Sequence, residues 1–268
     1  MIKSLVIAFS TYSKIPMPMM EFKKEDMKYC MCFFGLVGAV IGIVCSLLII
    51  LGQSFGLPSF VVGVLMTVIP IWITGGIHLD GFIDTMDAKN SYKDKSAKLE
   101  ILKDPHVGAF AIIHCIVYML LYFAFSVVFF ENIMLLDLNK ESACPSKATL
   151  FIVSYVGIFV LSRILSAISV ITFPKAKKEG MVSSMANSQE KRGLYILIIE
   201  LIVLLSLEFY VSQGCFWWCL IPAILVFTYY WKMSKKIFGG ITGDLAGYFL
   251  QVMELVCLIA LTIGSYIC

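Results

Sequence analysis

Charged residues are scarce in this chain. Of its 268 residues, 15% are Asp, Glu, Lys or Arg and 60% are hydrophobic, and the mean hydropathy is +0.91. A soluble domain usually carries about 25% charged residues, so the composition excludes an ordinary soluble protein. The net charge of +3 is also too small for the basic surface that nucleic-acid binding requires, and we predict no nucleic-acid partner.

The cysteines lack a metal-binding or disulfide pattern. Cys30 and Cys32 are separated by one residue, Cys215 and Cys219 by three, and most of the others lie inside apolar runs. We interpret them as small apolar packing residues. The first apolar stretch, residues 5–9, is too short for the hydrophobic region of a signal peptide, so we expect no cleaved leader.

Long apolar runs are abundant. A helix needs about 20 apolar residues to cross a hydrocarbon core of roughly 30 Å. Seven runs approach that length, near residues 32–52, 59–77, 109–130, 149–171, 194–213, 215–231 and 247–267. We therefore predict an all-α fold, a polytopic membrane helical bundle of about seven transmembrane helices. It would form a single integral-membrane domain over 1–268, with residues 1–31 as an interfacial N-terminal segment.

Basic residues fall mainly between alternate runs. Eighteen of the 21 Lys and Arg lie in segments 1–31, 78–108, 172–193 and 232–246, whereas the other connections hold Lys140 and Lys147. Because cytoplasmic loops collect Lys and Arg, we predict a multi-pass protein of the cytoplasmic (inner) membrane with its N-terminus in the cytoplasm. Membrane lipid is then an expected partner, and the sequence leaves a homo-oligomer open.

One polar stretch, residues 74–108, holds six of the eighteen acidic residues. Asp80, Asp84 and Asp87 stand at i, i+4 and i+7, within a sector of roughly 60° on one helix face. A solvated helix face is the plain alternative, but no Lys or Arg stands three or four residues away to relieve the charge. We therefore predict a Mg²⁺ site at the cytoplasmic face, completed by water and phosphate oxygens.

Residues near this cluster are candidates for substrate binding. Gly81 lacks a side chain, so a phosphate could approach the backbone closely there. Farther along, Lys103 and His106 could bind phosphate, and Asp104 could extend the acidic site. An ordinary i,i+3 pair between Glu100 and Lys103 is an equally weighted alternative.

Two further candidates lie in later segments. Arg163 stands about ten residues inside its apolar run, where a guanidinium is costly and needs a partner. A substrate phosphate, which suits the planar guanidinium, is one alternative, and a glutamate of another run (Glu200, Glu208 or Glu254) is the other. Asp244 lies at the inner end of the last run and could complete the metal site from a second helix.

Three motifs, HLDGFIDTMDA, KLEILKDPHVGAF and GGITGDLAG, occur in this order. With them the chain resembles the cobalamin synthase, or adenosylcobinamide-GDP ribazoletransferase, family over nearly its whole length. The resemblance places Asp80, Asp84 and Asp87 on the first motif, Glu100, Lys103, Asp104 and Gly108 on the second, and Asp244 on the third. The second motif reads LKDPH where many relatives have MKDSR, so the titratable His106 replaces a fixed charge.

The resemblance implies a Mg²⁺-dependent transferase with an active site at the cytoplasmic face. Its small-molecule substrates would be adenosylcobinamide-GDP and α-ribazole or its phosphate, and its products adenosylcobalamin or its phosphate and GMP. Displacement at a pyrophosphate phosphorus depends largely on positioning and charge neutralisation. We expect Mg²⁺ on Asp80, Asp84, Asp87 and Asp244, a proton acceptor at Asp84 or Asp87, and Lys103 and Arg163 on phosphate oxygens.

Two other functions are alternatives. A CDP-alcohol phosphotransferase also places helical Asp residues beside an Asp-Gly pair, but its motif has an Ala-Arg pair where this chain has Thr85 and Met86. A cation transporter would hold acidic residues near the bilayer midplane in paired broken helices. In this chain the acidic residues concentrate at one predicted membrane face.

Overall fold

The computed structural model describes residues 1–138, 146–176 and 191–267, and this part of the chain is helical. The long elements are α1 (Ile2–Tyr12), α2 (Phe34–Ser54), α3 (Ser59–Thr74), α4 (Ile77–Asn90), α5 (Lys95–Ile101), α6 (Ala109–Leu138), α7 (Lys147–Thr172), α9 (Lys191–Val211), α10 (Trp217–Met233) and α11 (Gly243–Ile267). Short helical turns, η1 (Lys24–Met27) and η2 (Cys30–Phe33), precede α2, and the π-helical turn η3 (Ser234–Phe238) follows α10. The all-α prediction is confirmed.

Within the described residues, five helices are long and apolar enough to cross a membrane: α2 with the turns before it, α6, α7, α9 and α11. The pair α3 and α4 gives a sixth if it counts as one broken span. The predicted number was about seven. The count is lower because α3 has only 16 residues and α10 only 17. The structure is that of a multi-pass membrane helical bundle.

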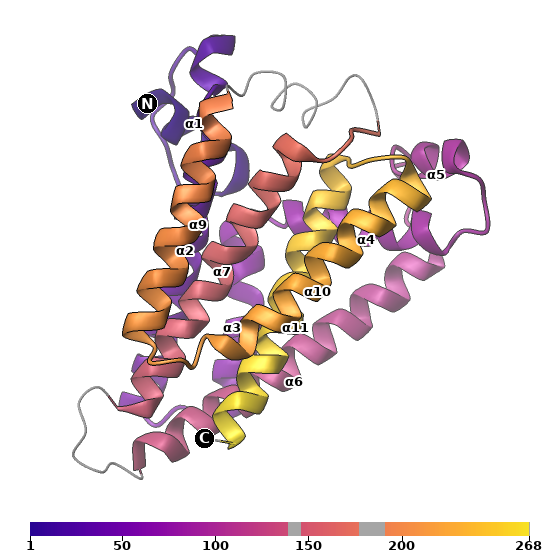
Figure 1. The fold of residues 1–268 in the computed structure, drawn as a ribbon. Helices are drawn as coiled ribbons and strands as arrows, with labels where there is room; N and C mark the ends of the chain where they lie inside the picture. The colour runs from indigo at the N-terminus through magenta and orange to yellow at the C-terminus, as the bar shows by residue number, and fades with distance from the viewer. Residues whose placement is uncertain (139–145, 177–190, 268) are drawn as a thin grey trace.

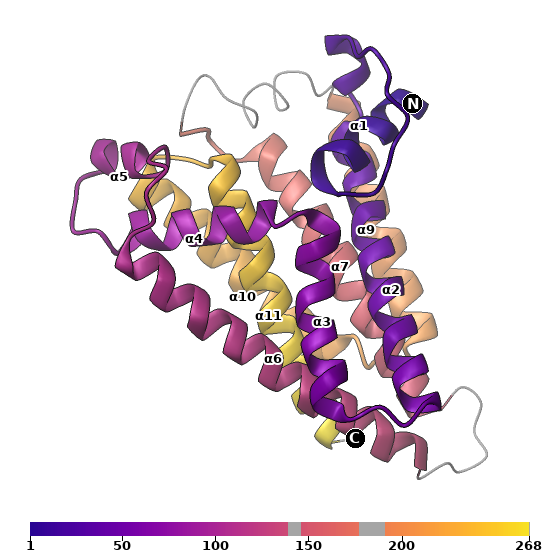
Figure 2. The ribbon, with the colours of Figure 1, turned by 180° about the vertical axis from the view of Figure 1, so that it is seen from behind.

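The helices run between two ends of the molecule. Helices α1, α4 and α5 lie at one end, where α7 finishes and α9 and α11 begin, and the C-terminus lies at the other end (Figures 1 and 2). The described parts of the four lysine- and arginine-rich segments therefore gather at one end. The three sequence motifs lie at that end as well.

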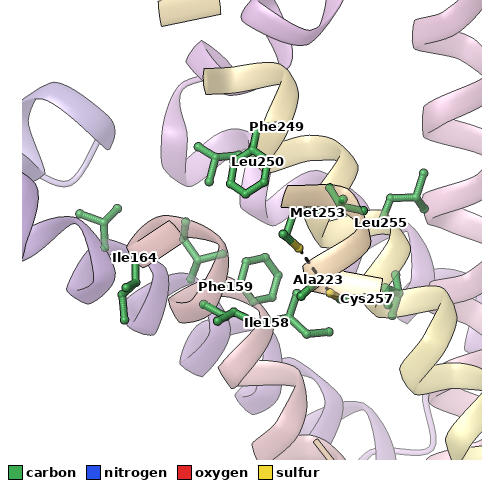
Figure 3. Close-up of a cluster of buried hydrophobic side chains, with 14 of the residues drawn as sticks. Ile158, Phe159, Ile164, Ala223, Phe249, Leu250, Met253, Leu255 and Cys257 are labelled. Carbon is green, nitrogen blue, oxygen red and sulfur yellow. Dashed lines mark hydrogen bonds between the residues drawn. The ribbon is translucent and has the colours of Figure 1, made fainter. Parts of the chain in front are cut away.

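Helices α7 and α11 form the centre of the bundle. In each of them 72% of the most apolar stretch is buried, against 22% in α6 and 17% in α9. Figure 3 shows part of this core, where Phe159 of α7, Ala223 of α10 and Met253 of α11 come together. Helices α6 and α9 leave apolar side chains exposed, as expected where lipid replaces protein as the neighbour.

The chain turns sharply between α3 and α4. Gly75 and Gly76 have φ values of 64° and 80°, a left-handed conformation that glycine adopts without steric cost. The two helices are inclined by 95°. As a result α4 leaves the direction of α3 and lies across the end of the bundle (Figure 2).

The contact between α2 and α7 depends on small residues. A Cβ at Gly38 would overlap the carbonyl oxygen of Phe159, and one at Gly42 would lie 2.8 Å from the Cα of Val156. Neither neighbour can move away without shifting the backbone of α7. At Gly35, by contrast, a Cβ would lie 3.3 Å from Cγ1 of Ile164, which is a flexible side chain.

This difference gives a test of the packing. Gly38→Ala should destabilise the protein by roughly 1–3 kcal/mol, the usual cost of forcing extra volume into a packed contact. Gly35→Ala is the matched control and should cost clearly less. Thermal unfolding in detergent measures both, and equal midpoints for the two variants would contradict the close contact at Gly38.

Candidate active site

Helix α4 carries the three acidic residues of the first motif on one face. Its opposite face, with Phe82, Thr85 and other residues, is buried. Asp80 is exposed, and Asp84 and Asp87 are half-buried. Asp80 lies in the first helical turn, where the partial positive charge of the helix N-terminus favours a carboxylate. The predicted shared face is thus observed at the end of the bundle.

A pair of glycines lets α11 touch α4. A Cβ at Gly81 would lie 2.8 Å from the backbone oxygen of Asp244, and one at Gly247 would lie 2.9 Å from the backbone oxygen of His78. The contact brings the first turn of α11, with Asp244, against α4. We predicted that Gly81 leaves room for a phosphate; in the structure the backbone of α11 occupies that side of Gly81.

The four aspartates interact electrostatically. The pKa of Asp84 is raised to about 6, first by partial burial and then by the negative charges of Asp80, Asp244 and Asp87. Acidic residues far apart in the sequence therefore meet, as expected. Among the described residues, however, no three His, Cys, Asp or Glu side chains form a ready-made metal site. Metal binding at this cluster stays a prediction.

Asp87 lies against the start of α6. A Cβ at Gly108 would overlap both carboxylate oxygens of Asp87, so a glycine at this position leaves the room that the carboxylate needs. Gly108 was placed on the second motif by resemblance. The reason for a glycine there is visible only in the structure, because it depends on where α4 and α6 meet.

The second motif forms a turn beside the cluster. Lys103 Nζ lies 2.7 Å from Glu100 Oε1, and both side chains are exposed, so the ordinary i,i+3 pair is present. Asp104 Oδ1 accepts a hydrogen bond of 3.0 Å from the backbone N–H of His106 and lies 2.7 Å from its ring Nδ1. These contacts lower the pKa of Asp104, which keeps it ionised near neutral pH.

A pocket of about 490 Å³ lies between α4, residues 102–107 and α6. One part of its lining is polar, with Asp80, Asp84, Lys103, Asp104 and His106. The remainder is largely apolar and consists of Ile83, Leu102, Pro105, Val107, Ala111, Ile112, Cys115 and Ile116. The first and second motifs thus share one pocket, as expected of a binding site.

Arg163 lies apart from this pocket. Its side chain is 1% exposed and forms an ion pair with Glu254 of α11. The guanidinium also donates to Ser162 Oγ at 2.9 Å. Of the two partners considered for Arg163, the structure contains the glutamate, and Arg163 is not among the residues that line the pocket. A role on substrate phosphate is therefore not supported.

Lys98 is a positioning residue that the sequence analysis missed. Its Nζ donates to the backbone oxygens of Ala88 at 3.0 Å and Lys89 at 2.8 Å, and also to that of Ser91. Carbonyl groups at a helix C-terminus lack helical partners and attract a cation. Lys98 thereby fastens α5 to the end of α4. The spacing from Lys98 to these carbonyls fits no helical register, so no periodicity could indicate it.

A short backbone contact fixes the start of α11. The N–H of Ile241 donates to the backbone oxygen of Pro174 at 2.8 Å, and the N–H of Ala176 donates to that of Ile241 at 3.1 Å. Thr242 Oγ1 then accepts a hydrogen bond from the N–H of Leu245 at 3.2 Å, in the manner of a helix cap. Most of the basic segment 172–193 lies outside the described residues.

His78 at the start of α4 is buried against the rings of Tyr12 and Phe34. Burial, and to a smaller degree the charge of Arg163, lowers the pKa of His78 to about 3. The imidazole is therefore neutral at physiological pH and does not serve as a proton donor there. Its position favours a structural role in holding α4 to the N-terminal segment.

Comparison with known proteins adds independent information. The family model described as cobalamin-5-phosphate synthase matches residues 4–262. An adenosylcobinamide-GDP ribazoletransferase of Lachnoclostridium phytofermentans is 43% identical over 98% of this chain and 95% of its own length. Ribazoletransferases of Clostridium perfringens and Clostridium botulinum are each 32% identical, over 94% and 95% of this chain and 94% of their own lengths.

No solved structure gives a significant match. The family match nevertheless covers nearly the entire chain, including α4, the second motif and the first turn of α11. This chain belongs to the cobalamin-5-phosphate synthase family.

Proposed function

We propose that the protein joins adenosylcobinamide-GDP to α-ribazole or α-ribazole phosphate, releasing GMP, in the last steps of cobalamin biosynthesis. The observation that carries this proposal is the meeting of all three motifs at one end of the bundle, around the pocket beside Asp80 and Asp84. Relatives that match over nearly their full length bear the ribazoletransferase name, which favours this activity over the phospholipid and transporter alternatives.

The reaction exchanges one phosphoester partner for another. A hydroxyl oxygen of the ribazole forms a bond to the phosphorus that remains on the cobinamide, and the bond from that phosphorus to the oxygen of GMP breaks. The hydroxyl proton passes to a carboxylate. Asp84 suits this role better than Asp87, because Asp84 lines the pocket and Asp87 does not.

Mg²⁺ is the cofactor that we propose, held by Asp80, Asp87 and Asp244, with Asp84 within the same cluster. Partial burial raises the pKa of Asp84 most, and the negative charges of Asp80, Asp244 and Asp87 raise it further; this second contribution supports the proposal, because a cation would relieve it. Because no three His, Cys, Asp or Glu side chains among the described residues form a ready-made site, water and substrate oxygens would have to supply much of the coordination, as they commonly do for Mg²⁺. When bound, the ion neutralises charge on the diphosphate and on the departing GMP.

We also propose how many times the chain crosses the membrane and which end of the bundle faces the cytoplasm. The protein lies in the inner membrane, and all seven predicted spans cross it, the shorter helices α3 and α10 included. The end of the bundle that carries α4 faces the cytoplasm, as does the N-terminus. The support is the distribution of Lys and Arg together with the gathering of those segments at one end (Figure 1). Helix α4 would then lie at the headgroup level, in contact with lipid.

The role of the acidic cluster can be tested at Asp80. Asp80→Asn should lower kcat/KM for GMP release by on the order of 100-fold in saturating Mg²⁺, because a ligand charge beside the diphosphate is lost. Asp94→Asn is the matched control: Asp94 is exposed in the same segment and caps α5 through Ala97, a bond that Asn also makes. Near-normal transfer by folded Asp80→Asn would refute the assignment.

A second test uses pH without turnover. The folded-state pKa of Asp84, about 6, lies above its ordinary value of 3.8, so ionisation of Asp84 opposes folding. That opposition is present above pH 6 and is relieved as the pH falls through 6. In Mg²⁺-free detergent solution, the unfolding midpoint should therefore rise between pH 7.5 and pH 5.5.

In Asp84→Asn the rise of the unfolding midpoint between pH 7.5 and pH 5.5 should shrink. In the unmodified protein, added Mg²⁺ should raise the midpoint at pH 7.5 by neutralising the cluster, and so should also reduce the rise. Glu21→Gln, which removes an exposed acid far from α4 in the sequence, serves as the control and should leave the rise intact. If the unfolding midpoint depended on pH in the same way in Asp84→Asn and in the unmodified protein, the coupling of Asp84 to the other aspartates would be contradicted.

A further inference from the structure

The pocket beside Asp84 is too small to hold the whole of the larger substrate. Its volume is about 490 Å³, within the roughly 300–1,000 Å³ typical of sites for drug-sized ligands. Adenosylcobinamide-GDP carries a corrin macrocycle, an adenosyl group and a guanosine diphosphate. A ribazole, by contrast, consists of one bicyclic base and one ribose, so this pocket has room for the whole molecule.

The wall of the pocket formed by α6 is apolar. It consists of Ala111, Ile112, Cys115 and Ile116. The alkylated bicyclic base of a ribazole offers mainly carbon to such a wall. A guanine offers amide and amino groups, and these would lose their hydrogen bonds to water on meeting aliphatic side chains. The wall therefore distinguishes the ribazole base from the guanine of the other substrate.

The carboxylates on the opposite side give the orientation. Asp80 and Asp84 line the pocket, whereas Asp244 does not, although its charge acts on Asp84. The first turn of α11 contacts α4 at Gly81, where a Cβ would lie 2.8 Å from the backbone oxygen of Asp244, so the start of α11 adjoins the part of α4 that carries Asp80 and Asp84. A nucleoside with its base on α6 directs its ribose toward Asp84, and the diphosphate would approach from the α11 side.

We propose that this pocket is the ribazole subsite and that the apolar wall of α6 selects the base. The proposal rests on the proposed function and adds the assignment of one substrate to one pocket. Ile112 and Ile116 are 51% and 54% exposed, so the wall continues onto the lipid-facing surface of α6. An apolar base can therefore enter from the membrane interface.

Cys115 provides a test that needs no turnover. It lines the pocket and is a half-exposed free thiol. In the purified full-length protein, α-ribazole should slow the alkylation of Cys115 by N-ethylmaleimide at least fivefold, without Mg²⁺ or corrinoid, as mapped by peptide mass spectrometry. Cys215, also half-exposed but between α9 and α10, is the internal control and should react unchanged.

The results of this protection experiment test the ribazole subsite separately from the transferase activity. Protection by α-ribazole and not by GMP supports the proposal. Protection by GMP alone, or by neither compound, overturns it, even if the protein catalyses transfer. Protection by α-ribazole in a protein that releases no GMP from adenosylcobinamide-GDP would leave the subsite standing and refute the proposed function.

Substitutions on α6 test the selecting wall. Ile116→Gln should raise the KM for α-ribazole by roughly 5–10-fold, the usual effect of lost apolar contact in a pocket, while the KM for adenosylcobinamide-GDP stays the same. Ile113→Gln is matched, because Ile113 is equally exposed on α6 but does not line the pocket; its kinetics should not change. An equal rise in both KM values for Ile116→Gln would argue against the subsite.

Discussion

The site depends on one backbone contact, the crossing of α4 and α11 at Gly81 and Gly247. Without side chains at these positions the two helices approach until their backbones touch. Asp244 therefore lies close enough to the α4 aspartates for its charge to act on Asp84. A methyl group at either glycine would meet backbone atoms, which cannot swing away as a side chain can. The electrostatic state of the cluster is therefore fixed by packing.

Other contacts make this crossing rigid. Helix α11 lies in the centre of the bundle, where Phe249 stacks on Tyr230 of α10 with ring centroids 4.7 Å apart, and its start is held by the pairing of residues 174–176 with Ile241. Lys98 holds the other end of α4. The acidic face of α4 is thus held in place by α5 and α11. A site that stabilises charge by preorganisation needs such rigid support.

The lengths of the apolar runs predicted most of the long helices, and helical periodicity predicted the shared face of Asp80, Asp84 and Asp87, since both follow from local sequence. It could not predict the partners of Gly81 and Gly108, because each is set by a second helix. For Arg163 the sequence left two partners open, and choosing between them required the position of Glu254. The number of helices long enough to cross also differs from the prediction, because the Gly75–Gly76 turn ends α3 after 16 residues and α10 has only 17.

The buried pair of Arg163 and Glu254 has a consequence for biogenesis. The two residues are 91 positions apart, and ribosomes add roughly 5–20 residues per second. During translation the guanidinium of α7 therefore enters the bilayer several seconds before its counter-ion exists. It must meanwhile reach toward the headgroups or be sheltered by the insertion machinery. Arrival of α11 neutralises it and brings Asp244 to the α4 aspartates in the same step, so the acidic cluster is complete only after the last helix has packed into the bundle.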